Sequence, residues 1–158
     1  MIDLLREARL FKECTSEELE DIASICHKIA FKNGEYVFSA NTPAEFLYLV
    51  QDGAIDLRFL VSHYSASKEM TIDRKFKGDA FGWSALTEPH VYTLSALAVK
   101  DTELLRIGEK DMMRLCKENS HLGYVLMKTI AQIIGERFDL VQKLLIDVIQ
   151  KSLSEKER

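Results

Sequence analysis

The stretch GDAFGWSALTEPHVYTLSA, residues 78–96, has the composition of a loop that wraps something small. It holds two glycines, a proline and the only tryptophan of the chain, followed by an alternating segment. Its acids are Asp79 and Glu88, and it contains no arginine. Its side chains therefore offer no guanidinium for the charge-assisted hydrogen bonds that usually hold a phosphate or a carboxylate.

Other residue types that commonly do chemistry are scattered along the chain. The histidines are isolated, without the His-x-His pattern of a metal-binding jelly-roll enzyme such as a cupin; they are His27, His63, His90 and His121. No GxSxG nucleophile motif is present. The cysteines form no CxxC pair and are expected to be reduced thiols; they are Cys14, Cys26 and Cys116. We expect no metal, no cofactor and no enzymatic activity.

Composition sets broader limits. A chain of 158 residues, 47% hydrophobic and 29% charged, is typical of one globular domain, here residues 1–158. The net charge is −4, and lysines and arginines are interleaved with acids, so DNA is not an expected partner. The N-terminus MIDLLREARLF has neither the apolar run of a signal peptide nor that of a membrane span. We expect a cytoplasmic protein without a membrane partner.

Helical patterns occupy both ends of the chain. Residues 1–28 carry apolar residues at helical spacing, and Thr15 with Glu18 forms the pattern of a capping box. Residues 109–153 carry a short helix that starts at Glu109 and a long one from Ser120 to about Ser152.

Between them, residues 29–107 read as short strands and turns. Asn33-Gly34 predicts a turn, Asp52-Gly53 predicts a hairpin, and residues 62–68 predict a polar loop. Ile55, Leu57, Phe59 and Val61 alternate with Asp56, Arg58 and Leu60. The spacing of the turn signals is typical of a sandwich or a barrel.

The segment KNGEYVFSANTPAEFLYLVQDGAIDL resembles the opening half of a cyclic nucleotide-binding domain, the effector domain of catabolite activator proteins. Gly34-Glu35, Pro43-Ala44 and Gly53 follow in the order of that family. Residues 77–107 are similar to its phosphate-binding cassette and the strands after it. The resemblance covers about residues 5–150 and implies an α+β fold: an eight-stranded antiparallel jelly roll with a helical segment before it and two helices after it.

The cassette departs from the family pattern at the two charged positions. Where the family has a glutamate that accepts from the ribose hydroxyl, this chain has Trp83. Where it has an arginine that pairs with the cyclic phosphate, this chain has Tyr92. The resemblance therefore implies a ligand pocket, but not one that binds cyclic AMP in the usual way.

Part of the pocket remains. Gly82 can open one helical turn whose amides, at Trp83, Ser84 and Ala85, favour an anion. Thr93 adds a hydroxyl, and Trp83 and Tyr92 add flat faces with polar tips. A small anionic ligand or a nucleotide is the expected occupant. Alternatively, the turn serves only the fold, and Trp83 and Tyr92 only fill the barrel.

The long helix carries more apolar residues than one barrel can cover. Met127, Ile134, Val141 and Val148 recur every seven residues, with Phe138 and Leu145 beside that row. An adjoining side, Leu126 to Leu144, can cover the barrel. In the resembled family the partner of such a row is the same helix of a second subunit, so these six residues are the candidate interface of a homodimer.

Two functions follow as hypotheses. One is a regulatory domain that senses a small molecule and passes the signal to an unidentified protein partner. The other is a dimeric interaction scaffold with a ligand-free pocket. In transcription factors of the resembled family a helix-turn-helix domain follows the long helix. The sequence ends at Arg158 without one, so for a protein that consists of this sequence alone we expect no direct DNA reading.

Overall fold

The computed structural model describes residues 1–63 and 66–156. The strands are β1 (Cys26–Phe31), β2 (Tyr36–Phe38), β3 (Phe46–Asp52), β4 (Ile55–His63), β5 (Ala66–Lys75), β6 (Ala80–Phe81), β7 (Ser95–Ala98) and β8 (Thr102–Gly108). They form two antiparallel sheets with strand orders β1-β8-β3-β6 and β2-β7-β4-β5. The predicted α+β class with an eight-stranded jelly roll is confirmed.

Strand β3 is buried on both faces of its sheet. Along β3, Tyr48 and Val50 point into the core between the two sheets, whereas Leu47 and Leu49 point into a second core beneath the helices. Successive side chains of a strand face opposite sides. The nearly unbroken apolar run FLYLV is therefore what a strand covered by a sheet on one face and by helices on the other requires.

The turn at Asp52-Gly53 does not form the predicted hairpin. It leads from β3 in one sheet to β4 in the other, so the strands it joins are not hydrogen-bonded to each other. Gly53 has φ +94 and lies against Thr102, whose hydroxyl accepts a hydrogen bond from the Ala54 amide at 3.2 Å. The Asp-Gly pair thus marks a tight turn correctly, but burial decides which strands pair.

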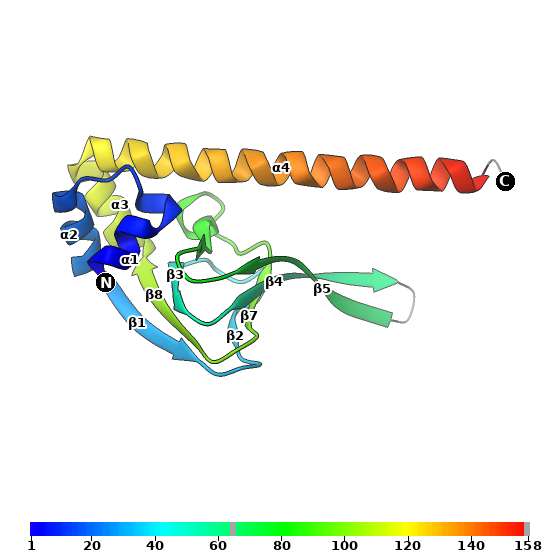
Figure 1. The fold of residues 1–158 in the computed structure, drawn as a ribbon, viewed down its shortest axis with the longest axis horizontal. Coiled ribbons are helices and arrows are strands. Elements are labelled where there is room, and N and C mark those ends of the chain that lie inside the picture. Colours follow the sequence, from blue (N-terminus) through cyan, green and yellow to red (C-terminus); the bar gives the residue numbers. More distant parts are fainter. Residues whose placement is uncertain (64–65, 157–158) are drawn as a thin grey trace.

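The longest hairpin of the described residues is instead β4–β5. Its ladder runs from Ile55↔Lys75 to His63↔Ala66. The polar loop predicted for residues 62–68 is therefore mostly strand; the two residues of it at 64–65 lie outside the described part. Figure 1 shows this hairpin extending well beyond the rest of the barrel.

The N-terminal segment forms α1 (Ile2–Glu7), a 3₁₀ turn η1 (Arg9–Phe11) and α2 (Ser16–Ser24). The capping box at the start of α2 is confirmed, since the Thr15 hydroxyl accepts from the Glu18 amide at 3.2 Å and the Glu18 carboxylate accepts from the Thr15 amide at 2.7 Å. The helical region predicted for residues 1–28 ends earlier, because Cys26 already pairs with Ile107 in β1.

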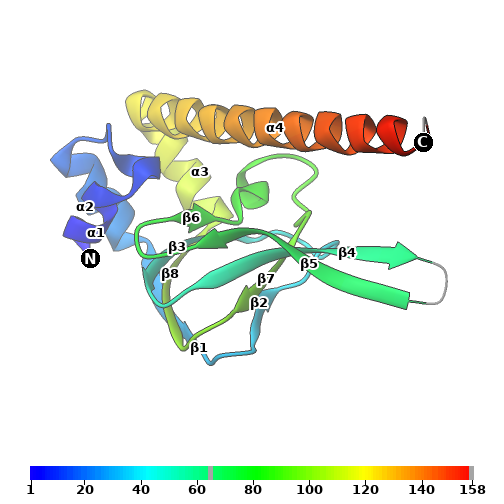
Figure 2. The ribbon, with the colours of Figure 1, turned by 45° about the vertical axis from the view of Figure 1, so that its right-hand side comes forward.

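The C-terminal helices are α3 (Glu109–Glu118) and α4 (Ser120–Lys156). The first half of α4 packs on the N-terminal helices through buried side chains that include Leu122, Leu126 and Ile130. Its 37 residues span about 55 Å. Figures 1 and 2 both show its second half running past the barrel on the same side as the β4–β5 hairpin.

A buried carboxylate joins α2 to the start of α4. Glu18 is 3% exposed, and besides its capping bonds its Oε1 lies 3.0 Å from the Asn119 amide nitrogen and 2.8 Å from His121 Nδ1. Burial by itself would raise the pKa of Glu18, but the hydrogen bonds from Thr15, His121 and Asn119 together hold it below its ordinary value. The ionised form of Glu18 is therefore the one that fastens the base of α4.

Because the folded pKa of Glu18 lies below the ordinary carboxyl value, its contribution to stability is present above that value and is lost as pH falls through the folded pKa. We expect Glu18→Gln to lower the free energy of unfolding by about 1–3 kcal/mol at pH 7, and the difference from wild type to shrink as pH is lowered through the carboxyl range. Urea titrations at several pH values measure this. Glu17→Gln, on the exposed first turn of α2, is the matched control, and equal costs for both substitutions would contradict the prediction.

Candidate functional site

The turn that opens the candidate pocket is built on Gly82, which has φ +80 and precedes the short 3₁₀ helix η2 (Trp83–Leu86). A Cβ at this position would lie 3.0 Å from the Phe46 carbonyl oxygen and 3.2 Å from the Tyr48 ring. Positive φ and close approach together require glycine here. The Ala85 amide donates to the Gly82 carbonyl at 3.1 Å. The prediction that the Ala85 amide is free to bind an anion is therefore wrong.

Five of the six sequence-predicted residues, all except Ala85, lie around one cavity, together with several that were not predicted. The cavity is lined by Phe38, Leu57, Gly82, Trp83, Ser84, Tyr92, Thr93, Leu94 and Arg137. Its volume is about 30 Å³, which is the space of a single water molecule. Pockets for drug-sized ligands hold about 300–1,000 Å³. In this conformation the cavity has no room for a nucleotide.

Tyr92 lines the cavity and is packed into the core between the sheets. Its ring stacks on Phe38 with centroids 3.6 Å apart and planes 8° apart, and it is 4% exposed. Its hydroxyl donates to the Phe46 carbonyl at 2.7 Å and accepts from the Phe46 amide at 3.2 Å. Burial raises the pKa of the Tyr92 hydroxyl. Tyr92 thus ties the cassette to β3, and because its hydroxyl is engaged with the Phe46 backbone, its predicted polar tip is not available to a ligand.

Trp83, Ser84 and Thr93 form the outer rim. Trp83 and Ser84 are half-buried and Thr93 is exposed. The Arg137 guanidinium carbon lies 4.6 Å from the centre of the Trp83 ring, a cation–π geometry. Arg137 also donates to Asp73 Oδ2 at 2.9 Å, and Lys75 lies 2.7 Å from the same oxygen.

Arg137 is the charged lining residue that the sequence analysis missed. It belongs to α4, more than forty positions after the cassette, so no local motif indicates it. A weak signal was present: it follows Ile130 by seven residues and Ile133 by four, which places it on the barrel-facing side of the helix. The pocket therefore has a cation, although none of the loop residues supplies it.

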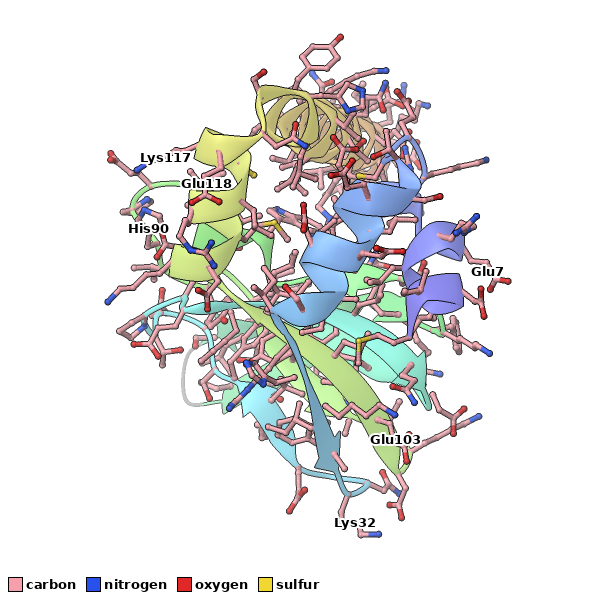
Figure 3. The ribbon with its side chains drawn as sticks, turned by 90° about the vertical axis from the view of Figure 1, so that its left-hand side faces the viewer. Glu7, Lys32, His90, Glu103, Lys117 and Glu118 are labelled. Carbon is pink, nitrogen blue, oxygen red and sulfur yellow. The ribbon has the colours of Figure 1, made fainter. Side chains whose placement is uncertain are left out.

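His90 belongs to a different part of the molecule. Its ring nitrogen Nδ1 lies 2.8 Å from the Ala85 carbonyl oxygen, and Figure 3 shows it on the α3 side, opposite the side on which Glu7 of α1 lies. It lines a cleft of about 380 Å³ with Ala44, Glu45, Phe46 and residues 108–111 at the start of α3. It does not line the cavity behind Trp83.

The remaining reactive groups of the described residues lie apart from the cavity behind Trp83. Within residues 1–63 and 66–156 no group of histidine, cysteine and carboxylate side chains is arranged to hold a metal ion. The three cysteines are free thiols, and burial raises the pKa of Cys14 and Cys26 to about 12. No helix in the described part of the chain is both long and apolar enough to cross a membrane.

Comparison with known proteins agrees with the jelly-roll fold. The sequence profile of the family described as cyclic nucleotide-binding domain matches residues 28–119. The chain is 32% identical to the anaerobic regulatory protein of Bacillus subtilis over 115 residues, which is 72% of this chain and 47% of that protein. It spans 60% of the cyclic AMP receptor protein of Thermus thermophilus, at 26% identity over 84% of this chain.

Solved structures give the same result. A Geobacter metallireducens structure assigned to cyclic nucleotide binding has a TM-score of 0.71 and 32% identity, with 86% of this chain and 96% of that chain covered. The Thermus thermophilus catabolite activator protein has a TM-score of 0.73 and 28% identity, covering 87% of this chain and 63% of that one. With the jelly roll, the Gly82 turn and the family profile in agreement, the chain belongs to the cyclic nucleotide-binding domain family.

Proposed function

We propose that the chain is a regulatory domain that senses a small ligand, and that this ligand is not a cyclic nucleotide held in the usual way. The regulatory role is supported by the relatives, of which one is named a regulatory protein and another a receptor protein. The ligand proposal rests on one observation: Trp83 and Tyr92 stand at the two charged positions of the family pattern, around a cavity of about 30 Å³.

The chemistry of a cyclic phosphate supports this proposal. A buried anion needs charge-assisted hydrogen bonds to replace its hydration. The arginine expected at position 92 is a tyrosine whose hydroxyl is engaged with Phe46. Arg137 reaches the rim of the cavity from outside, already paired with Asp73. Tyr92 has no guanidinium, and the guanidinium of Arg137 lies at the rim. The pocket therefore lacks a guanidinium deep inside it that would hold a cyclic phosphate against the Gly82 turn.

Cyclic AMP should therefore bind weakly or not at all. Each lost charge-assisted bond is worth about 1.5–3 kcal/mol, so the loss of two groups weakens binding by roughly 10²- to 10⁴-fold relative to a pocket that has both. Isothermal titration calorimetry is the measurement, with the Thermus thermophilus cyclic AMP receptor protein as the positive control in the same buffer. A dissociation constant in the micromolar range or tighter would refute this prediction.

A second function is favoured by the way the cavity is filled. The Phe38–Tyr92 stack and the Tyr92 bonds to Phe46 close the pocket with the chain's own side chains. A dimeric interaction scaffold with an empty pocket would look the same. Native mass spectrometry of the purified protein separates the two functions. A retained small molecule, or stabilisation by one in a thermal-shift screen of anionic metabolites, supports the sensor. The absence of both results supports the scaffold.

We also propose that the protein works as a homodimer through α4. Five of the six candidate interface residues are exposed: Ile134, Phe138, Val141, Leu145 and Val148. The sixth, Met127, is half-buried and packs against the chain's own core. Of the adjoining row, Leu126 and Ile130 are buried, whereas Leu140 and Leu144 are each 50% exposed. A seam that begins near Ile134 and continues along the distal half of α4 therefore fits the exposed surface.

A further inference from the structure

Arg137 connects three elements at the mouth of the pocket. It comes from α4, it lies over Trp83 of η2, and it donates to Asp73 of β5. Figures 1 and 2 both show the short green turn of η2 directly beneath α4. The Arg137 side chain is 25% exposed. Its bond to Asp73 uses one of five N–H donors of the guanidinium.

The walls of the cavity differ in how easily they can move. Phe38, Leu57 and Tyr92 belong to the packed core between the sheets. Gly82 to Ser84 form a turn that is held by positive φ and by close contact with β3. Arg137 is the long, unbranched side chain among the lining residues. Rotation about its side-chain bonds would widen the mouth without displacing the backbone.

We propose that Arg137 is the gate of the pocket and also its anion-binding residue, and that the ligand is a small oxyanion of the phosphate or carboxylate type. This inference rests on the proposed sensing function of the same pocket. The rim has the matching groups: the guanidinium of Arg137 stands with the hydroxyl-bearing Ser84 and Thr93 around one cavity. A planar guanidinium binds an oxyanion through two parallel hydrogen bonds.

Ligand binding would then exchange one partner of Arg137 for another. In the ligand-free protein the counter-charge is Asp73, which also contacts Lys75. An oxyanion on Arg137 leaves Asp73 with Lys75 alone and loosens the link between α4 and the β4–β5 hairpin. Occupancy of a pocket in the barrel is thereby transmitted to the helix that we propose as the dimer interface.

Trp83 provides a direct readout, because it is the only tryptophan of the chain. We expect titration with sodium phosphate at constant ionic strength to change its emission in a saturable way. Arg137→Gln should weaken this response roughly 10- to 100-fold. Arg114→Gln removes the same charge from the exposed surface of α3 and is expected to leave the response unchanged. Sulfate, methyl phosphate and acetate, titrated in parallel, distinguish an inorganic anion from a phosphate ester and from a carboxylate.

A second variant is expected to change the affinity for phosphate in the opposite direction. Asp73→Asn removes the competing carboxylate, so phosphate should bind roughly two- to fivefold more tightly. In the double variant Asp73→Asn/Arg137→Gln this gain should disappear. If the gain persists in the double variant, Lys75 is the cation that was released, and the role of Arg137 is refuted.

The remaining outcomes separate this inference from the proposed function. An anion response that is equal in wild type and Arg137→Gln overturns the inference but leaves a sensing pocket. The inference is also overturned if wild type gives no saturable response to any of the four anions. Micromolar binding of cyclic AMP that Arg137→Gln does not alter would overturn the proposed ligand specificity as well.

Discussion

Replacing Val141 and Val148 together by glutamate is expected to convert the proposed dimer into monomer or into insoluble protein. Both side chains are exposed on the single chain, at 42% and 63%, and they lie one heptad apart on α4. In a parallel helix pair they face their symmetry mates, so the substitution places like charges across a desolvated seam. A buried unpaired charge costs several kcal/mol, enough to weaken association roughly 10³-fold or more.

The reason to expect a dimer is the amount of apolar surface beyond the barrel. The distal part of α4 also exposes Leu140, Leu144, Leu145, Ile146, Ile149 and Leu153. Soluble monomers rarely carry so large a contiguous apolar surface. The β4–β5 hairpin and the distal half of α4 border a cleft of about 210 Å³ that Ile72, Leu140 and Leu144 help to line. One chain thus leaves its longest helix only partly covered.

A charge-matched control tests the position rather than the charge. Gln132 and Gln150 are exposed and lie nine residues on either side of Val141, which puts them on the opposite face of the helix. Gln132→Glu/Gln150→Glu adds the same charge and should remain dimeric in multi-angle light scattering. If wild type is monomeric at roughly tens of micromolar, or if Val141→Glu/Val148→Glu stays dimeric, the seam has been assigned wrongly.

Gly53→Ala is expected to have the largest effect on folding. Gly53 has φ +94, and a Cβ there would lie 2.7 Å from the Asp101 carbonyl oxygen and still closer to the Thr102 hydroxyl. The turn carries the chain from one sheet to the other, and its neighbour Ala54 is 1% exposed. Backbone strain and overlap should together lower the free energy of unfolding by roughly 3–5 kcal/mol, a large share of the total stability of a domain.

Gly34→Ala separates the two causes. Gly34 has φ +89, almost the same backbone conformation, but a Cβ there would meet nothing within 4 Å. This substitution should therefore cost only the left-handed strain, about 1–2 kcal/mol. Thermal or urea unfolding of the two variants measures the difference. Equal losses would mean that the close approach at Thr102 relaxes at no cost, which contradicts the prediction.

The elements of the fold were accessible from local patterns. Thr15 and Glu18 predicted the start of α2, Asn33-Gly34 and Gly82 predicted turns, and the apolar periodicity after Ser120 predicted the long helix. These signals are local because hydrogen bonds within a turn, the freedom of glycine at positive φ and the period of a helix involve residues close in sequence. The resemblance to the family then implied a jelly roll, which the patterns left open, but it assigned no individual strand pairs.

Tertiary structure alone decided which strands pair and what closes the pocket. Asp52-Gly53 looked like a hairpin but joins two sheets, since pairing depends on which faces are buried. Asp56 alternates with apolar neighbours as a solvent-facing residue would, yet it is 1% exposed and accepts from Arg74 at 3.0 Å. Arg137 and Tyr92 meet around one cavity although forty-five positions separate them. Contacts of this kind form only when packing brings distant segments together, so composition and local spacing do not predict them.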